Sequence, residues 1–170
     1  MKSKSSESSP EQAFQRALAL LAARDYSSAA LQRKLAGRGL DEADVQAAIE
    51  RLVAEGWLND RRYAEHFVES AMASGRFFGP RLRLEMRRRG ISPELVGDVL
   101  TAAVEQRHED DDIRMLVQRR YPAFSYDGAD ERTRRRIVSF LLRRGFGISA
   151  IMRVLKADAR GEDIDDSGSY

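Results

Sequence analysis

The sequence predicts an all-α protein built from tandem repeats of three-helix bundles. Two observations carry this prediction. One pattern of residues occurs three times along the chain, and its apolar positions are spaced as on one face of a helix. A third observation agrees with them, because no stretch shows the sustained apolar and polar alternation that is typical of a half-buried β-strand. We therefore predict helices and no strands.

The repeated pattern is centred on Gly39, Gly90 and Gly145. Each glycine follows an arginine, precedes an apolar residue, and has further apolar residues four and eight positions before it and six and ten positions after it. These apolar positions are Leu31, Leu35, Leu40, Val45 and Ile49, then Leu82, Met86, Ile91, Val96 and Leu100, then Ile137, Leu141, Phe146, Ile151 and Leu155. Each copy therefore predicts an amphipathic helix, a turn in which glycine takes the left-handed conformation, and a second amphipathic helix.

The other helices are predicted from apolar stripes and capping residues. A leading helix is expected over residues 11–23, with Phe14, Ala17, Leu18 and Leu21 on one side. Asp41 and Ser92 are suited to begin the second helices of the first two copies, and Pro93 suits a first turn.

The first two copies each predict a third helix. The first begins at Asn59 or Asp60, either of which could be its cap, and has an inward stripe that includes Tyr63 and Phe67. The second begins at the acids of residues 109–112, which favour a helix N-terminus, and ends before Tyr121. The third copy lacks a third helix, because the chain turns polar and acidic beyond Lys156.

These elements divide the chain into five parts. We expect a disordered N-terminal tail over residues 1–10, a leading helix with the first three-helix repeat over 11–75, the second three-helix repeat over 76–122, an incomplete third repeat over 123–157, and a disordered acidic tail over 158–170. Charged residues make up 33% of the 170, which suits an elongated body with much surface.

Composition indicates the cellular compartment of the protein. The chain has no cysteine, which excludes disulfides and thiolate metal sites and fits a reducing compartment. Its polar N-terminus lacks the apolar core of a secretory signal, and no apolar run approaches membrane-spanning length. We therefore expect a soluble cytoplasmic protein that is monomeric and contacts no membrane.

Positive charge is concentrated in two segments although the net charge is only +2. Residues 76–90 hold six arginines against Glu85, and residues 131–144 hold six against Glu131. Acids gather instead at residues 109–112 and in the C-terminal tail. A polyanion or an acidic protein groove could bind the basic segments.

Within these segments, helical spacing selects the candidate binding residues. Arg81 with Arg88, and Arg136 with Arg143, are seven residues apart, so each pair shares a face that points away from the apolar stripe. Guanidinium groups there could contact phosphates or carboxylates, or the face could simply be solvated. The remaining candidates are Arg83, Arg87 and, in the first repeat, Arg33 and Lys34.

Several other residues have a structural interpretation. Arg38, Arg89 and Arg144 precede the three turns, where a cation offsets a helix dipole. Trp57, Tyr63 and Phe67 are expected in the core, whereas Phe77 and Phe78 beside Gly79-Pro80 could pack or stack on bases.

Catalysis has little support in the sequence. His66 and His108 show no metal-ligand spacing, and Asp110 to Asp112 lack an accompanying phosphate-binding loop. We therefore expect neither an enzyme, a metal nor a cofactor.

Three blocks of the chain resemble the RecX family of bacterial RecA regulators. They are the run from Ala19 to Ser27, the run from Gly56 to Ala64, and Gly79-Pro80 followed by Leu84 to Gly90. The resemblance implies a curved rod of three-helix units that binds the groove of the RecA–DNA filament. It also implies restraint of ATP hydrolysis, strand exchange and the co-protease activity in recombination, DNA repair and the SOS response, with non-specific binding to single- and double-stranded DNA.

A second interpretation belongs to another functional class. Helices joined by a glycine turn resemble helix-turn-helix modules, so the chain could be a direct DNA-binding protein such as a transcription factor. The stacked copies favour a long binding surface over a single recognition helix, and residues 41–55 carry more acids than bases. A sequence-specific footprint on duplex DNA would favour this alternative.

Overall fold

The computed structural model of the chain describes residues 9–105 and 107–161. Within these ranges it contains nine α-helices and no β-strand, as the sequence predicts. The helices are α1 (Pro10–Ala23), α2 (Ser28–Ala36), α3 (Glu42–Ala54), α4 (Asp60–Ala73), α5 (Gly79–Arg88), α6 (Pro93–Glu105), α7 (Glu109–Arg120), α8 (Glu131–Arg144) and α9 (Ile148–Gly161). Among the described residues, none of the helices is both long and apolar enough to cross a bilayer.

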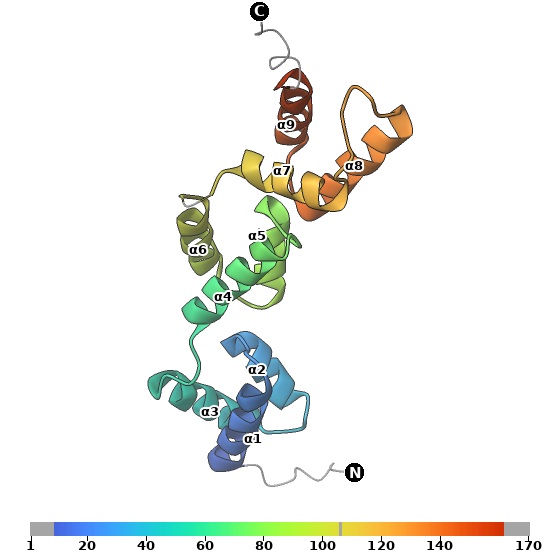
Figure 1. Cartoon of the computed structure of the whole chain (residues 1–170). Coiled ribbons are helices and arrows are strands. Elements are labelled where there is room, and N and C mark those ends of the chain that lie inside the picture. Colours follow the sequence, from blue (N-terminus) through green and yellow to red (C-terminus); the bar gives the residue numbers. More distant parts are fainter. Residues whose placement is uncertain (1–8, 106, 162–170) are drawn as a thin grey trace, which may run out of the picture. The chain divides into compact units, whose positions relative to one another are not determined.

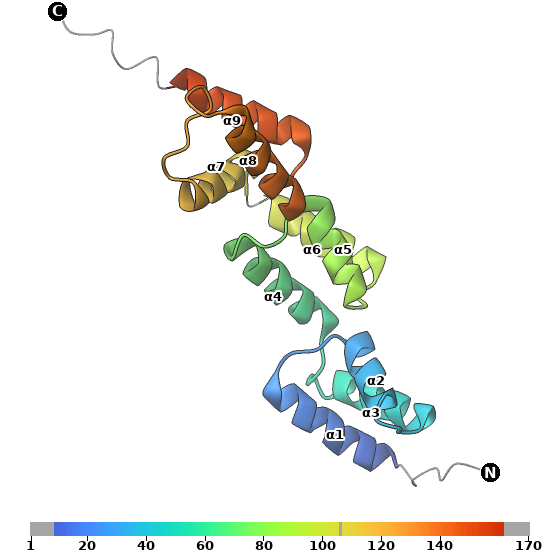
Figure 2. The same ribbon diagram turned by 90° about the vertical axis from the view of Figure 1, so that its right-hand side faces the viewer.

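The helices form two compact units. Unit 1 comprises the described residues up to Phe67 together with Glu85–Val99, and unit 2 comprises Val68–Leu84 with the described residues from Leu100 onward. In unit 1, α1 packs along α3, and α2 contacts both helices (Figure 1). In unit 2, α9 packs against α7 and α8 (Figure 2).

The repeated apolar positions all belong to the core. All fifteen of them are buried, and none is more than 8% exposed. Burial removes each of these side chains from water, which stabilises a helix far more than local propensity does. The repeated pattern is therefore a pattern of packing.

The three turn glycines have the expected left-handed backbone. Their φ angles are 78° at Gly39, 83° at Gly90 and 109° at Gly145. A side chain is strained at such angles, because its Cβ crowds the following carbonyl oxygen. The turns that end the first helix of each copy are thus built as predicted.

Two of these turns also join one copy of the pattern to the copy before it. A Cβ placed on Gly90 would lie 2.5 Å from the Cβ of Ala29 on α2, and one placed on Gly145 would lie 2.1 Å from the carbonyl oxygen of Phe78. Hydrogen bonds hold both junctions: the Ser27 hydroxyl donates to the carbonyl of Arg89, and the Phe78 N–H donates to the carbonyl of Arg144 over 2.8 Å. In each case a glycine turn packs on the start of the first helix of the preceding copy.

Capping residues begin the helices where the sequence places them. Asp41 accepts a hydrogen bond from the backbone N–H of Ala43 at the start of α3. Of the two candidates for α4, Asn59 accepts from the N–H of Arg62 over 2.9 Å. Asp60 instead accepts from the N–H of Ser28 over 2.7 Å, so it caps α2 from another helix.

The expected tail boundaries are wrong at both ends. Ser9 caps α1 and Pro10 is its first residue, because proline fits a first turn. At the other end, α9 continues to Gly161, and the carboxylate of Asp158 bonds Arg114 of α7 over 3.1 Å. The rest of the two expected tails, residues 1–8 and 162–170, lies outside the described residues.

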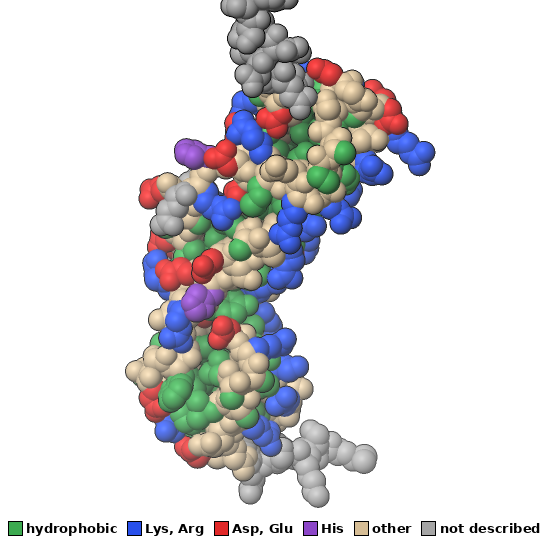
Figure 3. Space-filling model, in the orientation of Figure 1, with side chains coloured by type: hydrophobic (Ala, Val, Ile, Leu, Met, Phe, Trp, Pro, Cys, Tyr) green, Lys and Arg blue, Asp and Glu red, His purple; other side chains and the backbone are tan. Residues whose placement is uncertain are grey.

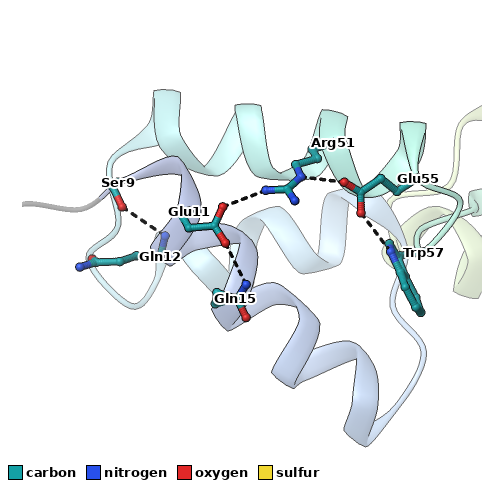
Figure 4. A network of polar contacts seen from close by, with 7 residues as sticks. All are labelled: Ser9, Glu11, Gln12, Gln15, Arg51, Glu55 and Trp57. Atoms are coloured by element: carbon teal, nitrogen blue, oxygen red, sulfur yellow. Dashed lines mark hydrogen bonds and ion pairs between the residues drawn. The ribbon is translucent and has the colours of Figure 1, made fainter.

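The prediction that Trp57 is a core residue is also wrong. Its side chain is 58% exposed and lies after α3, where Gly56 turns the chain with φ 77° and Leu58 takes the buried position. The indole N–H donates to Glu55, which also bonds Arg51, and Arg51 bridges to Glu11 of α1 (Figure 4). Tyr63 and Phe67 are only half-buried, and the inward side of α4 is formed by Ala64, Val68, Ala71 and Met72.

Candidate partner and nucleic-acid interface

In unit 1 the basic candidates lie on α2 and at the end of α5. Arg33, Lys34 and Arg87 are exposed, and none of them forms an ion pair with any described residue. Lys and Arg side chains gather along the edge of unit 1 that α2 forms (Figure 3). Arg33 borders the Gly90 turn, since its Nη1 would lie 3.3 Å from a Cβ on that glycine. These cations are therefore available to an anionic partner.

Arg88 is exposed as expected, but its charge is partly compensated. Its guanidinium lies 3.1 Å from the carboxylate of Glu85, which is itself buried and also pairs with Arg89. A partner carboxylate or phosphate would compete with Glu85 for Arg88. The solvated-face and binding-face interpretations both fit this residue.

In unit 2 the basic candidates lie mainly on α8. Arg136 and Arg143 are exposed, and within the described part of the chain neither forms an ion pair. Arg135 on the same helix is different, because its guanidinium is paired with Glu131 over 2.8 Å. Figure 3 shows basic side chains along α8, where Arg132 is also exposed. This helix presents unpaired guanidinium groups together with one paired arginine that can serve as a control.

Arg81 does not lie on the open face that its spacing predicts. It is half-buried, and its Cβ would lie 2.7 Å from a Cβ placed on Gly145, so it packs against the turn of the next copy. Its guanidinium also lies 5.7 Å from the centre of the Phe77 ring. Helical spacing alone missed this contact because it treats α5 as an isolated helix. Arg83, two residues on, is exposed.

The arginines before the last two turns have structural contacts. Arg89 donates to the Glu85 carboxylate over 3.0 Å and lies 4.1 Å from the centre of the Phe67 ring. Arg144 donates to the carbonyl of Arg76 over 3.3 Å and lies 5.1 Å from the centre of the Phe140 ring. Their recurrence thus reflects packing near the turns as well as the helix dipole.

Sequence reasoning missed a group of aromatic residues beside α8. Tyr121, Phe124 and Tyr126 lie in the segment between α7 and α8, and all are half-buried. The guanidinium of Arg136 lies 5.6 Å from the centre of the Tyr121 ring, and that of Arg134 lies 4.9 Å from the centre of the Tyr126 ring. The signal was available, since three aromatic residues within six positions stand between two arginine-rich stretches.

Phe77 and Phe78, which the sequence left open, lie beside the start of α5. Phe78 is buried and stacks on Phe146 with ring centres 4.5 Å apart. Phe77 is half-buried between Arg76 and Arg81. Phe78 therefore belongs to the core.

Three acids at the start of α7 are paired with arginines: Asp110 with Arg153 of α9, Asp111 with Arg114 of α7, and Asp112 with Arg107. Arg153 bonds Asp110, and this hydrogen bond holds the pKa of the Asp110 carboxyl below its usual range. Arg114 pairs with Asp111 and with Asp158. No group of three or more potential metal ligands occurs among the described residues. These acids hold helices together.

Comparison with known proteins agrees with this architecture. Models of the first, second and third three-helix domains of RecX match residues 13–52, 59–100 and 108–155. A "Regulatory protein RecX" of Trichlorobacter lovleyi is 43% identical over 147 residues, which cover 86% of this chain and 96% of the relative. The chain belongs to the RecX family.

Other RecX proteins extend the similarity. The "Regulatory protein RecX" of Syntrophotalea carbinolica is 33% identical, over 83% of this chain and 92% of its own length. The crystal structure of RecX from Lactobacillus salivarius has the same fold, with a TM-score of 0.69 at 21% identity over 87% of this chain and 97% of that one.

The RecX domain models divide the helices differently from the spacing of the repeats. They group α1 to α3, α4 to α6 and α7 to α9, whereas the spacing treats α1 as a leading helix and leaves the third repeat incomplete. Both divisions use the same three glycine turns. In the RecX models α1, α4 and α7 are the first helices of their domains. In the division by spacing, α4 and α7 instead end the first and second repeats.

Proposed function

We propose that this chain regulates RecA by binding the RecA–DNA filament and restraining its ATP hydrolysis, strand exchange and co-protease activity. Membership of a family whose curated members are named regulatory proteins carries the proposal. The exposed, unpaired arginines of α8 support it further, because both the phosphates of DNA and the carboxylates of a protein groove bind guanidinium groups two oxygens at a time.

The charge on the helices after the turns argues against a sequence-specific transcription factor. In a helix-turn-helix protein the second helix enters the major groove and needs donors for the bases and phosphates. Here α6 has three acids and no Lys or Arg, and the one arginine of α3, Arg51, is paired with Glu11 and Glu55. The helices before the turns, in contrast, carry exposed cations such as Arg33, Arg87 and Arg136 that form no ion pair with a described residue.

RecA-dependent ATP hydrolysis on single-stranded DNA tests the proposal. We expect inhibition at substoichiometric amounts of this chain, because a protein that spans several protomers or blocks a growing end affects more than one RecA molecule. The matched comparison is Arg136→Ala against Arg135→Ala, whose guanidinium is already paired with Glu131. Full hydrolysis in the presence of equimolar protein would contradict the proposed function.

A further inference from the structure

A hollow of about 590 Å³ lies between α8 and the segment that joins α7 to it. The residues that line it include Tyr121 and Phe124 of the segment and Thr133, Arg136 and Ile137 of α8. The whole site lies within unit 2. It brings aromatic and aliphatic residues together with an arginine, and the positions of the repeat pattern do not predict it.

The aromatic wall is held in place. Tyr121 meets Phe140 of α8 edge to face, with ring centres 5.8 Å apart and planes at 81°. Its N–H donates to the carbonyl of Val117 over 2.7 Å, which ends α7, and its own carbonyl accepts from Phe124 over 3.0 Å. An aromatic ring fixed in this way offers a stacking surface at little cost in conformational entropy.

The rest of the segment is fastened to α8 by one arginine. The Arg134 guanidinium donates to the carbonyls of Tyr126 over 2.8 Å and Asp127 over 3.2 Å. The N–H of Ala129 donates to the carbonyl of Ser125 over 3.1 Å. The shape of the hollow is therefore set before any ligand binds.

Electrostatics favours an anion on the α8 side of the segment. A second hollow, of about 310 Å³, lies on the α7 and α9 side of the same segment, but its Arg114 is neutralised by Asp111 and Asp158. On the α8 side, Arg132 and Arg136 form no ion pair with a described residue. Asp130 also lines this hollow, and its carboxylate accepts the N–H of Thr133 at the helix start over 2.6 Å.

We propose that this hollow binds an unstacked base of single-stranded DNA against the Tyr121 ring, with the neighbouring phosphates on Arg136 and Arg132. An aromatic ring stacks on any base, and adjacent guanidinium groups bind the backbone. A base of duplex DNA is stacked on both faces and paired along one edge, so it cannot enter the hollow without being flipped out. The site therefore prefers single strands, and it rests on the proposed function only for its biological setting.

Binding of the full chain to oligothymidylate and to a duplex of equal length, without RecA, tests the site. Tyr121→Ala is expected to weaken binding to the single strand about 5- to 150-fold, the range for loss of one stacked base, and to leave duplex affinity within about twofold. Tyr121→Phe keeps the ring and is expected to bind as wild type does. Equal losses on both DNAs, or no loss on oligothymidylate, would overturn the proposal.

Because Tyr121 also packs on Phe140, a second measurement uses the wild-type protein. Irradiation of a bound oligonucleotide that carries 5-iodouracil is expected to crosslink Tyr121 or Phe124. Crosslinks confined to other residues would overturn the site even if the Tyr121→Ala variant fails to fold. Failure of the proposed function is distinguishable, since it would leave these results intact while RecA hydrolysis stayed uninhibited.

Discussion

The adjacent residues Trp57 and Leu58 show that the type of a residue does not by itself decide whether it is buried. Trp57 has the larger side chain, yet its ring is exposed, while Leu58 is only 2% exposed. Gly56 decides between them, because its left-handed backbone redirects the chain after α3. The exposed indole is oriented by a hydrogen bond to Glu55 rather than by packing.

This difference predicts opposite costs for two adjacent substitutions. Trp57→Ala is expected to change the free energy of unfolding by no more than about 0.5 kcal/mol, as at other surface sites. Leu58→Ala removes a fully packed side chain and is expected to cost about 2–5 kcal/mol. Thermal or urea unfolding of both variants measures this. A large loss of stability for Trp57→Ala would place the indole in an apolar contact.

At the scale of elements, the glycine turns have two structural roles. Each ends a helix, and the turns at Gly90 and Gly145 also pack on the start of a helix in the preceding copy. Gly39 only ends a helix, since nothing described lies within 4 Å of a Cβ placed on it. The same residue in the same pattern is therefore under different steric constraints.

Alanine substitutions distinguish the cost of a strained backbone from the cost of a clash with a neighbouring helix. Gly39→Ala is expected to cost about 1–2 kcal/mol, the strain of a left-handed residue with a Cβ. Gly90→Ala and Gly145→Ala are expected to cost more, because the new methyl group meets Ala29 or the Phe78 carbonyl. Valine at any of the three positions is expected to destabilise the protein further. Unfolding curves of the three alanine variants give the ranking, and equal losses would contradict the packing at the junctions.

The Gly90 junction allows a more stringent test. Ala29→Gly removes the methyl group that a Cβ at position 90 would strike, so the double variant is expected to be more stable than the sum of the single losses predicts. Such coupling is typical of residues in contact. A strictly additive double variant would show that Ala29 is not the obstacle.

The ion pairs between α7 and α9 predict a dependence on acid. The hydrogen bond from Arg153 lowers the pKa of Asp110 from its ordinary value of 3.8, so the folded state binds this proton less readily than the unfolded state. Its contribution to stability is complete above the ordinary pKa and is lost as the pH falls through the lowered one. Asp110→Asn is expected to lower the melting temperature at neutral pH and to lessen its fall in acid. Glu69→Gln, an exposed change on α4, is the control and is expected to leave the profile unchanged.

At the scale of the whole molecule, we expect the proposed binding to depend on which cations are left without an ion pair. A net charge of +2 conceals arginines that already bond an acid or a carbonyl, such as Arg89, Arg134 and Arg153, and exposed cations that form no ion pair with a described residue. Arg136 and Arg143 on α8, and Arg33, Lys34 and Arg87 in unit 1, belong to the second group. The second group can bind a partner without breaking an ion pair to a described residue.

Removing the unpaired arginines of α8 is therefore expected to affect binding and spare the fold. Arg136→Ala with Arg143→Ala should leave the melting temperature nearly unchanged, weaken binding to DNA and filament, and reduce the salt slope by about 0.7 per lost contact on single strands. Arg81→Ala with Arg88→Ala is expected to destabilise the protein as well, because the Arg81 side chain is half-buried and its guanidinium lies 5.7 Å from the centre of the Phe77 ring. Affinities at two salt concentrations measure both pairs. Unchanged affinity and slope would leave Arg33 and Lys34 as the next candidates.

What the sequence by itself determined is the set of elements and the inward side of most of them. Leu31, Met86 and Ile151 of the repeated pattern are buried, as predicted. Apolar periodicity predicts such positions because the apolar face of an amphipathic helix packs against the core. The turns at Gly39, Gly90 and Gly145 were equally readable, since glycine adopts their backbone at little cost. The resemblance to the RecX family was detectable because each of the blocks that carry it is a short segment of the sequence.

Only the tertiary structure decided which residues meet across elements. The burial of Arg81 against Gly145, the capping of α2 by Asp60, and the hollow between Tyr121 and Arg136 all join positions that no helical periodicity relates. Spacing along one helix describes a face, but not what is packed upon it. The availability of each arginine therefore depends on its neighbours in space, because a guanidinium that already bonds an acid or a carbonyl must break that bond before it binds a partner.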